Sequence, residues 1–440
     1  MPDIDMLLER AQQAVELCKT AGADNAWANA SRNRSVEFTT RDGKLEKVQE
    51  STSRGLSVEI YAEGRYSSHS TTDLRPENLQ AFIAEAVALT KALQPDPFRF
   101  IPDPALFEGR PAVDLDLVDP ALGQVTQAQR QQWCEAMDAA AGAHDKVIST
   151  ESTVQDDSYM SAAASSNGFT GTKAETGIWF VSSVSLQDEG DKRPSNYDYL
   201  GGHFVSELPD PTVVGQGALE RALARLGSVK GPTGAETIVV DRRAAGRLLG
   251  SLLGPASARS IQQGRSFWAG KIGQPLASDK LTIIDDPLLV RGFASRLFDG
   301  EGIAARQLPI LEAGVAKNVY VDTYYGKKAE LQPTTGSPSN RVITLGDKDL
   351  EALLAQVGAG IYVTSWLGGN SDGTTGDFSF GLEGHLIEGG KIGACVGEMN
   401  ATGNLVDLFM HLSAVGNDPW KYSSTLVPTL VFEGVQISGA

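Results

Sequence analysis

The stretch that decides the fold of the first half is Phe38 to Leu74, FTTRDGKLEKVQESTSRGLSVEIYAEGRYSSHSTTDL. Its Asp42-Gly43 pair is a strong signal for a two-residue hairpin turn, and a second turn falls at Glu63-Gly64. Between the turns, apolar residues alternate with polar ones from Leu56 to Ile60, which is the period of a half-buried strand. The stretch therefore predicts an antiparallel meander.

Helices are expected on both sides of this meander. Apolar residues recur at helical spacing from Ile4 to Cys18, and Pro76 opens a second amphipathic run that reaches Leu93. Six prolines within residues 95–120 predict an extended connector. A third helix is expected from about Val125 to Ala141, and the alternating polar stretch beyond it has a hairpin signal at Asn167-Gly168.

The second half is predicted to be rich in short strands. A helix near 211–226 precedes the glycine-flanked run Gly227 to Gly234, which marks the expected boundary between an N-terminal domain, 1–230, and a C-terminal domain, 231–440. Helices are expected at about 243–253, 348–356 and 403–412. The expected strands are Thr237–Val240, Leu281–Ile284, Val315–Val321, Ile361–Trp366, Phe378–Leu382 and Leu430–Ile437.

These patterns define the fold class as α+β. The N-terminal α/β domain combines the antiparallel meander with flanking helices. The C-terminal domain is glycine-rich and mostly antiparallel, and it forms either a sheet or a distorted barrel.

The charge balance excludes some classes of partner. The chain has 38 Lys and Arg against 55 Asp and Glu, a formal charge of −17, and its pI is near 4.8. Nucleic acid and anionic membrane surfaces both require clustered positive charge, so neither is an expected partner. Three cysteines far apart in sequence and the absence of a secretory signal pattern favour the cytoplasm.

The inventory of catalytic motifs is empty. No phosphate-binding glycine loop and no nucleophile elbow occurs, and none of the five histidines has a second histidine within a few residues. The nearest His/Cys pair is His385 and Cys395, on either side of a hairpin turn at Gly389-Gly390. A turn centred there places His385 opposite Ala394 and points Cys395 to the other face, which argues against joint metal ligation.

Three segments carry a resemblance to a known family. The first is the meander already quoted, and the second is FDGEGIAARQLPILEAGVAKNVYVDTYYGKKAE, Phe298 to Glu330. The third is TGDFSFGLEGHLIEGGKIGACVGEMNATGNLVDLF, Thr375 to Phe409, which is followed by Gly416-Asn417-Asp418. Together and in this order they resemble the TldD/TldE (PmbA) family.

The resemblance implies a cytosolic peptidase of two related subunits that degrades or processes unfolded and leader peptides. One subunit of such a pair is a zinc metallopeptidase with a His-Glu-three residues-His motif and a Cys ligand after the Gly-Asn-Asp segment. The other subunit lacks the motif and completes a shared cavity.

This chain lacks both parts of the family's zinc site, the His-Glu-three residues-His motif and the later Cys ligand. By resemblance the motif positions are Gly250, Ser251 and Pro255, none of which can ligate zinc or act as a base, and no cysteine follows Gly416-Asn417-Asp418. The chain is therefore interpreted as the TldE-like subunit. It is expected to have no catalytic residue and no metal of its own, to form a heterodimer with a zinc-containing TldD-like subunit, and to be inactive alone.

A peptide site is predicted at Gly376, Asp377, Phe378 and Ser379, where a strand edge would hold an extended peptide by β-addition. A tight strand entry is the simpler explanation of these four residues. Two other functions stay open: a self-sufficient hydrolase that uses Cys395 or Ser379 as nucleophile, and a homo-oligomeric peptide-binding protein. A homodimer in isolation is also left open.

Overall fold

The computed structural model describes residues 2–439, which form two compact units. The N-terminal unit contains the stretch that ends at Leu186, together with Ser195–Arg221 and Arg296–Ala305. The C-terminal unit contains Gln187–Pro194, Ala222–Ser295 and the stretch from Arg306 onward. No helix within residues 2–439 is both long and apolar enough to cross a membrane.

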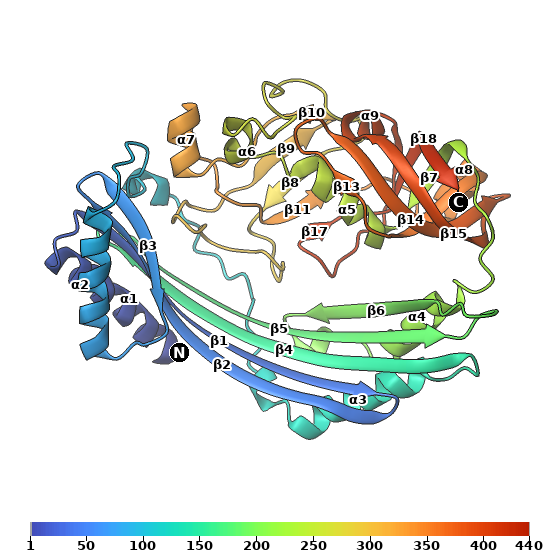
Figure 1. The fold of residues 1–440 in the computed structure, drawn as a ribbon, viewed down its shortest axis with the longest axis horizontal. Coiled ribbons are helices and arrows are strands. Elements are labelled where there is room, and N and C mark those ends of the chain that lie inside the picture. The colour runs from blue at the N-terminus through green and yellow to red at the C-terminus, as the bar shows by residue number, and fades with distance from the viewer. Residues whose placement is uncertain (1, 440) are drawn as a thin grey trace. The chain divides into compact units, whose positions relative to one another are not determined.

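The N-terminal unit is one antiparallel sheet with helices on it (Figure 1). The sheet order is β3-β2-β1-β4-β5-β6. Its strands are β1 (Asn25–Arg41), β2 (Lys44–Ala62), β3 (Arg65–Thr71), β4 (Val147–Ser165), β5 (Thr170–Leu186) and β6 (Ser195–Gly202). Its helices are α1 (Pro2–Thr20), α2 (Pro76–Lys91), α3 (Gln127–Ala141) and α4 (Thr212–Leu223), with short 3-10 turns at Pro104–Phe107, Leu122–Gln124 and Val205–Glu207.

Side-chain alternation explains which face of this sheet the helices cover. Ala28, Ala30, Val36 and Phe38 on β1 are buried, whereas the odd-numbered residues from 29 to 37 between them are polar. The buried face packs against α1 and α2 at one end and α3 at the other, where the Cys134 thiol donates to the Phe38 carbonyl at 3.3 Å. The predicted meander, its two turns and the flanking helices are confirmed.

The C-terminal unit is built around a closed barrel. Its seven-stranded sheet runs β12-β7-β18-β15-β14-β13, and an additional pairing of β12 with β14 closes five of the strands into a ring. These strands are β7 (Gly234–Val240), β12 (Ala359–Trp366), β13 (Asn370–Ser371), β14 (Asp377–Glu388), β15 (Lys391–Asn404) and β18 (Leu430–Gly439), and β16 (Leu412–Val415) also pairs with β18. Only β12 and β7 run parallel in this sheet, so the predicted distorted barrel is confirmed.

A second, five-stranded sheet and several helices complete the unit. The sheet order is β10-β9-β8-β11-β17. Its strands are β8 (Ile283–Asp286), β9 (Leu308–Glu312), β10 (Val315–Ala316), β11 (Asn340–Ile343) and β17 (Thr425–Leu426). The helices are α5 (Arg242–Leu253), α6 (Ala258–Gln262), α7 (Thr323–Ala329), α8 (Leu350–Val357) and α9 (Leu405–Met410).

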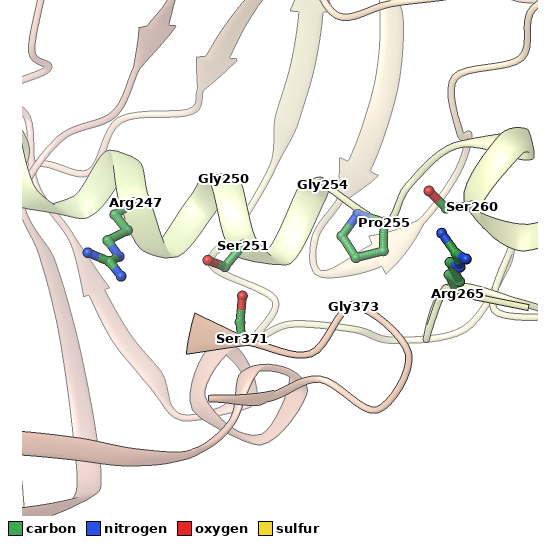
Figure 2. Close-up of a pocket in the computed structure, with 9 residues that line it drawn as sticks. All are labelled: Arg247, Gly250, Ser251, Gly254, Pro255, Ser260, Arg265, Ser371 and Gly373. Atoms are coloured by element: carbon green, nitrogen blue, oxygen red, sulfur yellow. The ribbon is translucent and has the colours of Figure 1, made fainter. Parts of the chain in front are cut away.

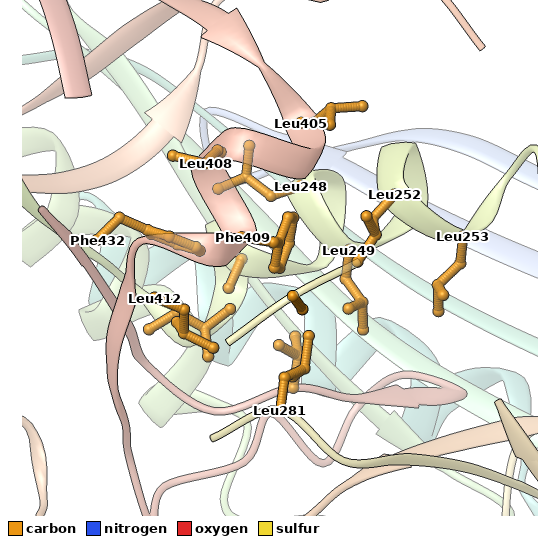
Figure 3. Packing of buried hydrophobic residues seen from close by; sticks show 14 of the residues in the cluster. Leu248, Leu249, Leu252, Leu253, Leu281, Leu405, Leu408, Phe409, Leu412 and Phe432 are labelled. Carbon is orange, nitrogen blue, oxygen red and sulfur yellow. The ribbon is translucent and has the colours of Figure 1, made fainter. Parts of the chain in front are cut away.

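The core of the C-terminal unit lies beneath α5. Leu248, Leu249, Leu252 and Leu253 are all at most 2% exposed, and they pack in one cluster with Phe409 of α9, Phe432 of β18 and Leu281 (Figure 3). Each leucine removed from water in this way contributes about 1.5–3 kcal/mol. This face of α5 is therefore held firmly against the unit's core.

Two strand predictions are wrong in detail. The predicted strand Val315–Val321 pairs only at Val315–Ala316, and Tyr320 makes an isolated bridge to Ser257. The predicted pairing of His385 with Ala394 is also wrong, because His385 lies opposite Cys395. The turn at Gly389-Gly390 is as predicted, but a bulge between His385 and Ile387 shifts the register by one residue.

Barrel closure depends on a glycine. A Cβ on Gly384 of β14 would stand 2.0 Å from the Tyr362 carbonyl oxygen of β12, so the two backbones meet without room for a side chain. We expect Gly384→Ala to lower the free energy of unfolding by roughly 1–3 kcal/mol, measured as a shift of the urea midpoint. Gly397→Ala on β15 is the matched control, because its Cβ would have nothing closer than 3.8 Å. Equal midpoints for the two variants would contradict this account of closure.

Candidate functional site

The exposed side of α5 presents the residues that the resemblance matches to the zinc motif. Arg247, Gly250, Ser251 and Gly254 follow one another at helical spacing of three, four and seven residues, so they share one face. This face lies opposite the buried leucines. Asp241 caps the helix by accepting from the Arg243 amide at 2.8 Å.

The helix ends just before the third motif position. Leu253 is the last helical residue, Gly254 is the C-cap, and Pro255 follows. A proline at this position is expected to end the helix, because it cannot donate the backbone hydrogen bond that would continue it. Pro255 is buried, and its carbonyl oxygen accepts from the Ser266 hydroxyl at 2.7 Å. The motif position is thus built into the turn that leaves the helix.

A pocket of about 440 Å³ opens along this face of α5 (Figure 2). The pocket is lined by Arg247, Gly250, Ser251, Gly254, Pro255, Ser260, Arg265, Ser371 and Gly373. In Figure 2 the Ser371 hydroxyl points toward α5, whose pocket-facing side carries Ser251. The three residues predicted to stand at the motif positions, Gly250, Ser251 and Pro255, therefore line one cavity.

The two arginines of this pocket differ in how they are held. Arg247 donates to the carbonyl oxygens of Gly368 and Gly369 at 2.7 and 2.9 Å, and its guanidinium lies 4.5 Å from the centre of the Phe380 ring. Arg265 is exposed, and its side chain has no hydrogen-bond or ion-pair partner within residues 2–439. Arg247 thus pins the loop before β13, whereas the Arg265 charge is available.

The backbone around Arg265 is fixed by local bonds. Gly264 adopts φ +68° after α6, which turns the chain so that the Arg265 amide donates to the Ser260 carbonyl at 2.8 Å. Three residues on, the fully buried Trp268 donates its indole N–H to the Leu252 carbonyl at 2.8 Å. The arginine therefore projects from an anchored loop.

A second pocket, of about 780 Å³, adjoins the first and shares Arg265, Ser371 and Gly373 with it. It is lined by Arg265, Asn370, Ser371, Asp372, Gly373, Thr374, Asp377, Phe378 and Ser379. Three of the four residues predicted to line a peptide cavity thus border a pocket next to the motif positions.

These four predicted residues have different surroundings. Asp377 and Ser379 are exposed, while Phe378 is 6% exposed and stacks on Phe380 with ring centres 5.2 Å apart. Gly376 has φ +88° and forms the tight strand entry. Hydrogen bonds from Asn404 and then Thr375 hold the pKa of Asp377 below its usual range, so this carboxylate is ionised near neutral pH.

The family motif's metal does not fit these residues. A zinc site needs three ligands from His, Cys, Asp or Glu, and none of these types lines the pocket against α5. Two permanently charged guanidinium groups there would also repel a divalent cation. Across the described residues, no group of three or more such side chains is placed to hold a metal ion.

The other place expected to supply a ligand is also occupied differently. Asp418 accepts from the Thr429 hydroxyl at 2.9 Å, and Trp420 lies under Arg243, whose guanidinium is 4.5 Å from the ring centre. This segment therefore packs against the start of α5 with an aromatic side chain and provides no thiol.

The His385 and Cys395 pair shows no sign of an activated nucleophile. Burial raises the pKa of the Cys395 thiol, with smaller contributions from Glu383 and Asp188 opposed by Arg225. Burial lowers the pKa of His385, whose Nε2–H donates to the Ala224 carbonyl at 3.0 Å while Nδ1 has no partner. A reactive cysteine needs a depressed pKa, so this environment works against nucleophilic catalysis.

Sequence reasoning missed Arg247, Arg265, Ser371 and Gly373. Arg247 could have been found, because it stands one turn before Gly250 on the same helix face. Arg265 and the loop residues reach the pocket only through tertiary structure, and their local sequence carries no signal of it.

The sequence of the chain matches a known protein family along most of its length. Models of the PmbA/TldA metallopeptidase family match it in three successive parts: domain 1 over residues 29–90, the central domain over 120–226 and the C-terminal domain over 233–439. The chain belongs to the PmbA/TldA (TldD/TldE) metallopeptidase family, as its sequence predicted.

Individual relatives cover nearly the whole chain. Metalloprotease PmbA of Escherichia coli O157:H7 is 28% identical over 437 residues, which span 99% of this chain and 96% of that protein. The crystal structure of a proposed DNA gyrase modulator from Bacteroides thetaiotaomicron VPI-5482 is 36% identical, with a TM-score of 0.95 over 98% of both chains. TldE of Thermococcus kodakarensis shares the fold, with 18% identity and a TM-score of 0.85 over 98% of this chain and 100% of that one.

The raised thiol pKa values predict slow alkylation. Burial raises the pKa of both Cys18 and Cys134 to about 12 and also raises that of Cys395, so little thiolate exists at pH 7.5. We expect all three thiols of the native protein to react with iodoacetamide more slowly than a free cysteine peptide, followed by intact mass. Unfolding in guanidinium should remove the difference, and fast alkylation of native Cys395 would contradict the assignment of an inert thiol.

Proposed function

We propose that this chain is the non-catalytic partner subunit of a two-subunit, cytoplasmic zinc metallopeptidase. In this role it binds unfolded or leader peptides in the groove made by its two adjoining pockets. A homologous subunit with an intact zinc motif supplies the metal and the hydrolytic chemistry.

One observation carries this proposal. Family membership comes with a pocket at the expected motif positions, yet that pocket is lined by Gly250, Ser251, Pro255 and two arginines. This lining supports the interpretation that the chain has a cavity where its catalytic relatives bind zinc, but has neither the metal ligands nor the general base. A subunit that binds substrate for another active site would keep this combination.

The groove also has a means of holding an extended chain. β13 is the last strand of its sheet, and Asn370 and Ser371 are both exposed beside the pockets. An edge strand can pair with a peptide main chain regardless of peptide sequence. This would suit substrates that share an unfolded state and no particular motif.

The proposal predicts that cleavage needs both subunits. An unfolded polypeptide should be cleaved by the mixture of this chain with its zinc-motif homologue and by neither component alone, because each lacks part of the shared cavity. Elemental analysis should find zinc in the homologue and not in this chain. Cleavage and stoichiometric zinc in the isolated chain would refute the proposal.

A double variant separates the alternatives. Cys395→Ala with Ser379→Ala removes both candidate nucleophiles of the isolated chain, and the proposal assigns a chemical step to neither side chain. If the isolated wild-type chain cleaves and the double variant does not, the chain is a self-sufficient hydrolase. If the mixture is no more active than the homologue alone but this chain still binds peptides, a homo-oligomeric peptide-binding protein is the better interpretation.

A further inference from the structure

We infer that the pocket against α5 is a carboxylate-binding subsite in which Arg265 is the primary contact. The ligand class is a peptide carboxylate, either the C-terminal one or that of an Asp or Glu side chain. This inference rests on the proposed peptide-binding function and adds a chemical preference to it.

The charges that line this pocket all have one sign. Arg247 and Arg265 are its only ionisable lining residues, and no carboxylate of the described chain lines it. The protein as a whole carries a formal charge of −17, so this pocket is a local positive site on an acidic molecule. An anionic group would be repelled elsewhere and attracted here.

Arg265 has the features of an unsatisfied recognition group. Its guanidinium has five N–H donors in a planar fork that matches a carboxylate, and none of them is used within residues 2–439. Arg247 is different, because its Nη2 already donates to the carbonyl oxygens of Gly368 and Gly369. Binding through Arg265 therefore breaks no existing interaction.

The surroundings of Arg265 favour binding further. Its loop is anchored through Ser260, Gly264 and Trp268, so the backbone at Arg265 is ordered before the ligand arrives. The hydroxyls of Ser251 and Ser371 also lack partners within the described chain, and both residues line the same pocket. Both can donate to a carboxylate oxygen.

The partial negative charge at the C-terminal end of α5 opposes an anion only weakly. A helix terminus carries about half an elementary charge, against two full positive charges from the arginines. The net field of the lining therefore remains attractive to a carboxylate.

The adjoining pocket suggests how a peptide would run. It contains Asp372 and Asp377, so the groove passes from a positive end against α5 to an end with carboxylates. A peptide whose carboxylate lies at Arg265 would extend its chain past β13 toward these acidic residues. Peptides with basic residues upstream of the carboxylate should fit this arrangement best.

The test measures binding of four fluorescent peptides to the isolated chain by anisotropy. The first is an uncharged, unstructured decapeptide with a free C-terminus, and the second is its C-terminal amide. The third and fourth are amides with one internal Glu or Gln. If the pocket recognises the α-carboxylate, the peptide with a free C-terminus should bind on the order of tenfold more tightly than its amide. If it recognises a side-chain carboxylate, the Glu peptide should bind more tightly than the Gln peptide by a similar factor.

Variants assign that preference to the pocket. Arg265→Gln should abolish it, and Arg265→Lys should retain part of it, because a point charge replaces the bidentate fork. Arg259→Gln is the matched control: Arg259 is exposed on α6 and does not line the pocket, so the preference should survive the same change of charge. Circular dichroism and the urea midpoint verify that each variant is folded.

Two results would overturn the inference in different ways. Equal binding of all four peptides, or an unchanged preference in Arg265→Gln, would remove the carboxylate subsite and leave peptide binding intact. No binding of any peptide would remove peptide binding by this chain as well, and the subsite with it.

Discussion

Burial of the leucine face of α5 is the interaction on which the C-terminal unit depends. Leu248, Leu249, Leu252 and Leu253 fix the rotation of the helix, because exposing any of them would lose contacts with the core around Phe409 and Phe432. Once that face is fixed, positions 247, 250, 251 and 254 must line the pocket. Residue types at these positions contribute little to the core, so the architecture is compatible with Gly250 and Ser251 on the exposed face of α5.

Much of the fold follows from local sequence, and the failures have identifiable causes. A two-residue turn is specified by the backbone preference of Asp42-Gly43, and the start of α2 by that of Pro76. Helix α5 is specified by the periodic spacing of its leucines. The pairing of His385 with Cys395 depends on a bulge two residues from a correctly located turn, and periodicity alone contains no signal for a bulge. The closure of β12 onto β14 is a tertiary contact that no local pattern encodes.

Fewer features of the candidate site than of the fold could be predicted from the sequence. Gly250, Ser251 and Pro255 were located through the resemblance, and the structure places all three on one pocket. Arg265 was not, because its position depends on the left-handed turn at Gly264 and on Trp268 inserted beneath α5. Residues that reach a site through loops are set by three-dimensional anchoring, so sequence spacing cannot reveal them.

If the resemblance locates the zinc motif at this pocket, the residues present here change its chemistry but keep its positive charge. The family's zinc motif would give this place a divalent cation, and here two arginines give it a positive charge. A guanidinium attracts and orients oxygen anions but cannot generate a nucleophilic hydroxide at neutral pH, which requires a metal or a base. A subunit built this way would hold the same class of polar peptide group and leave it uncleaved, which is the division of labour expected between two related subunits around one cavity.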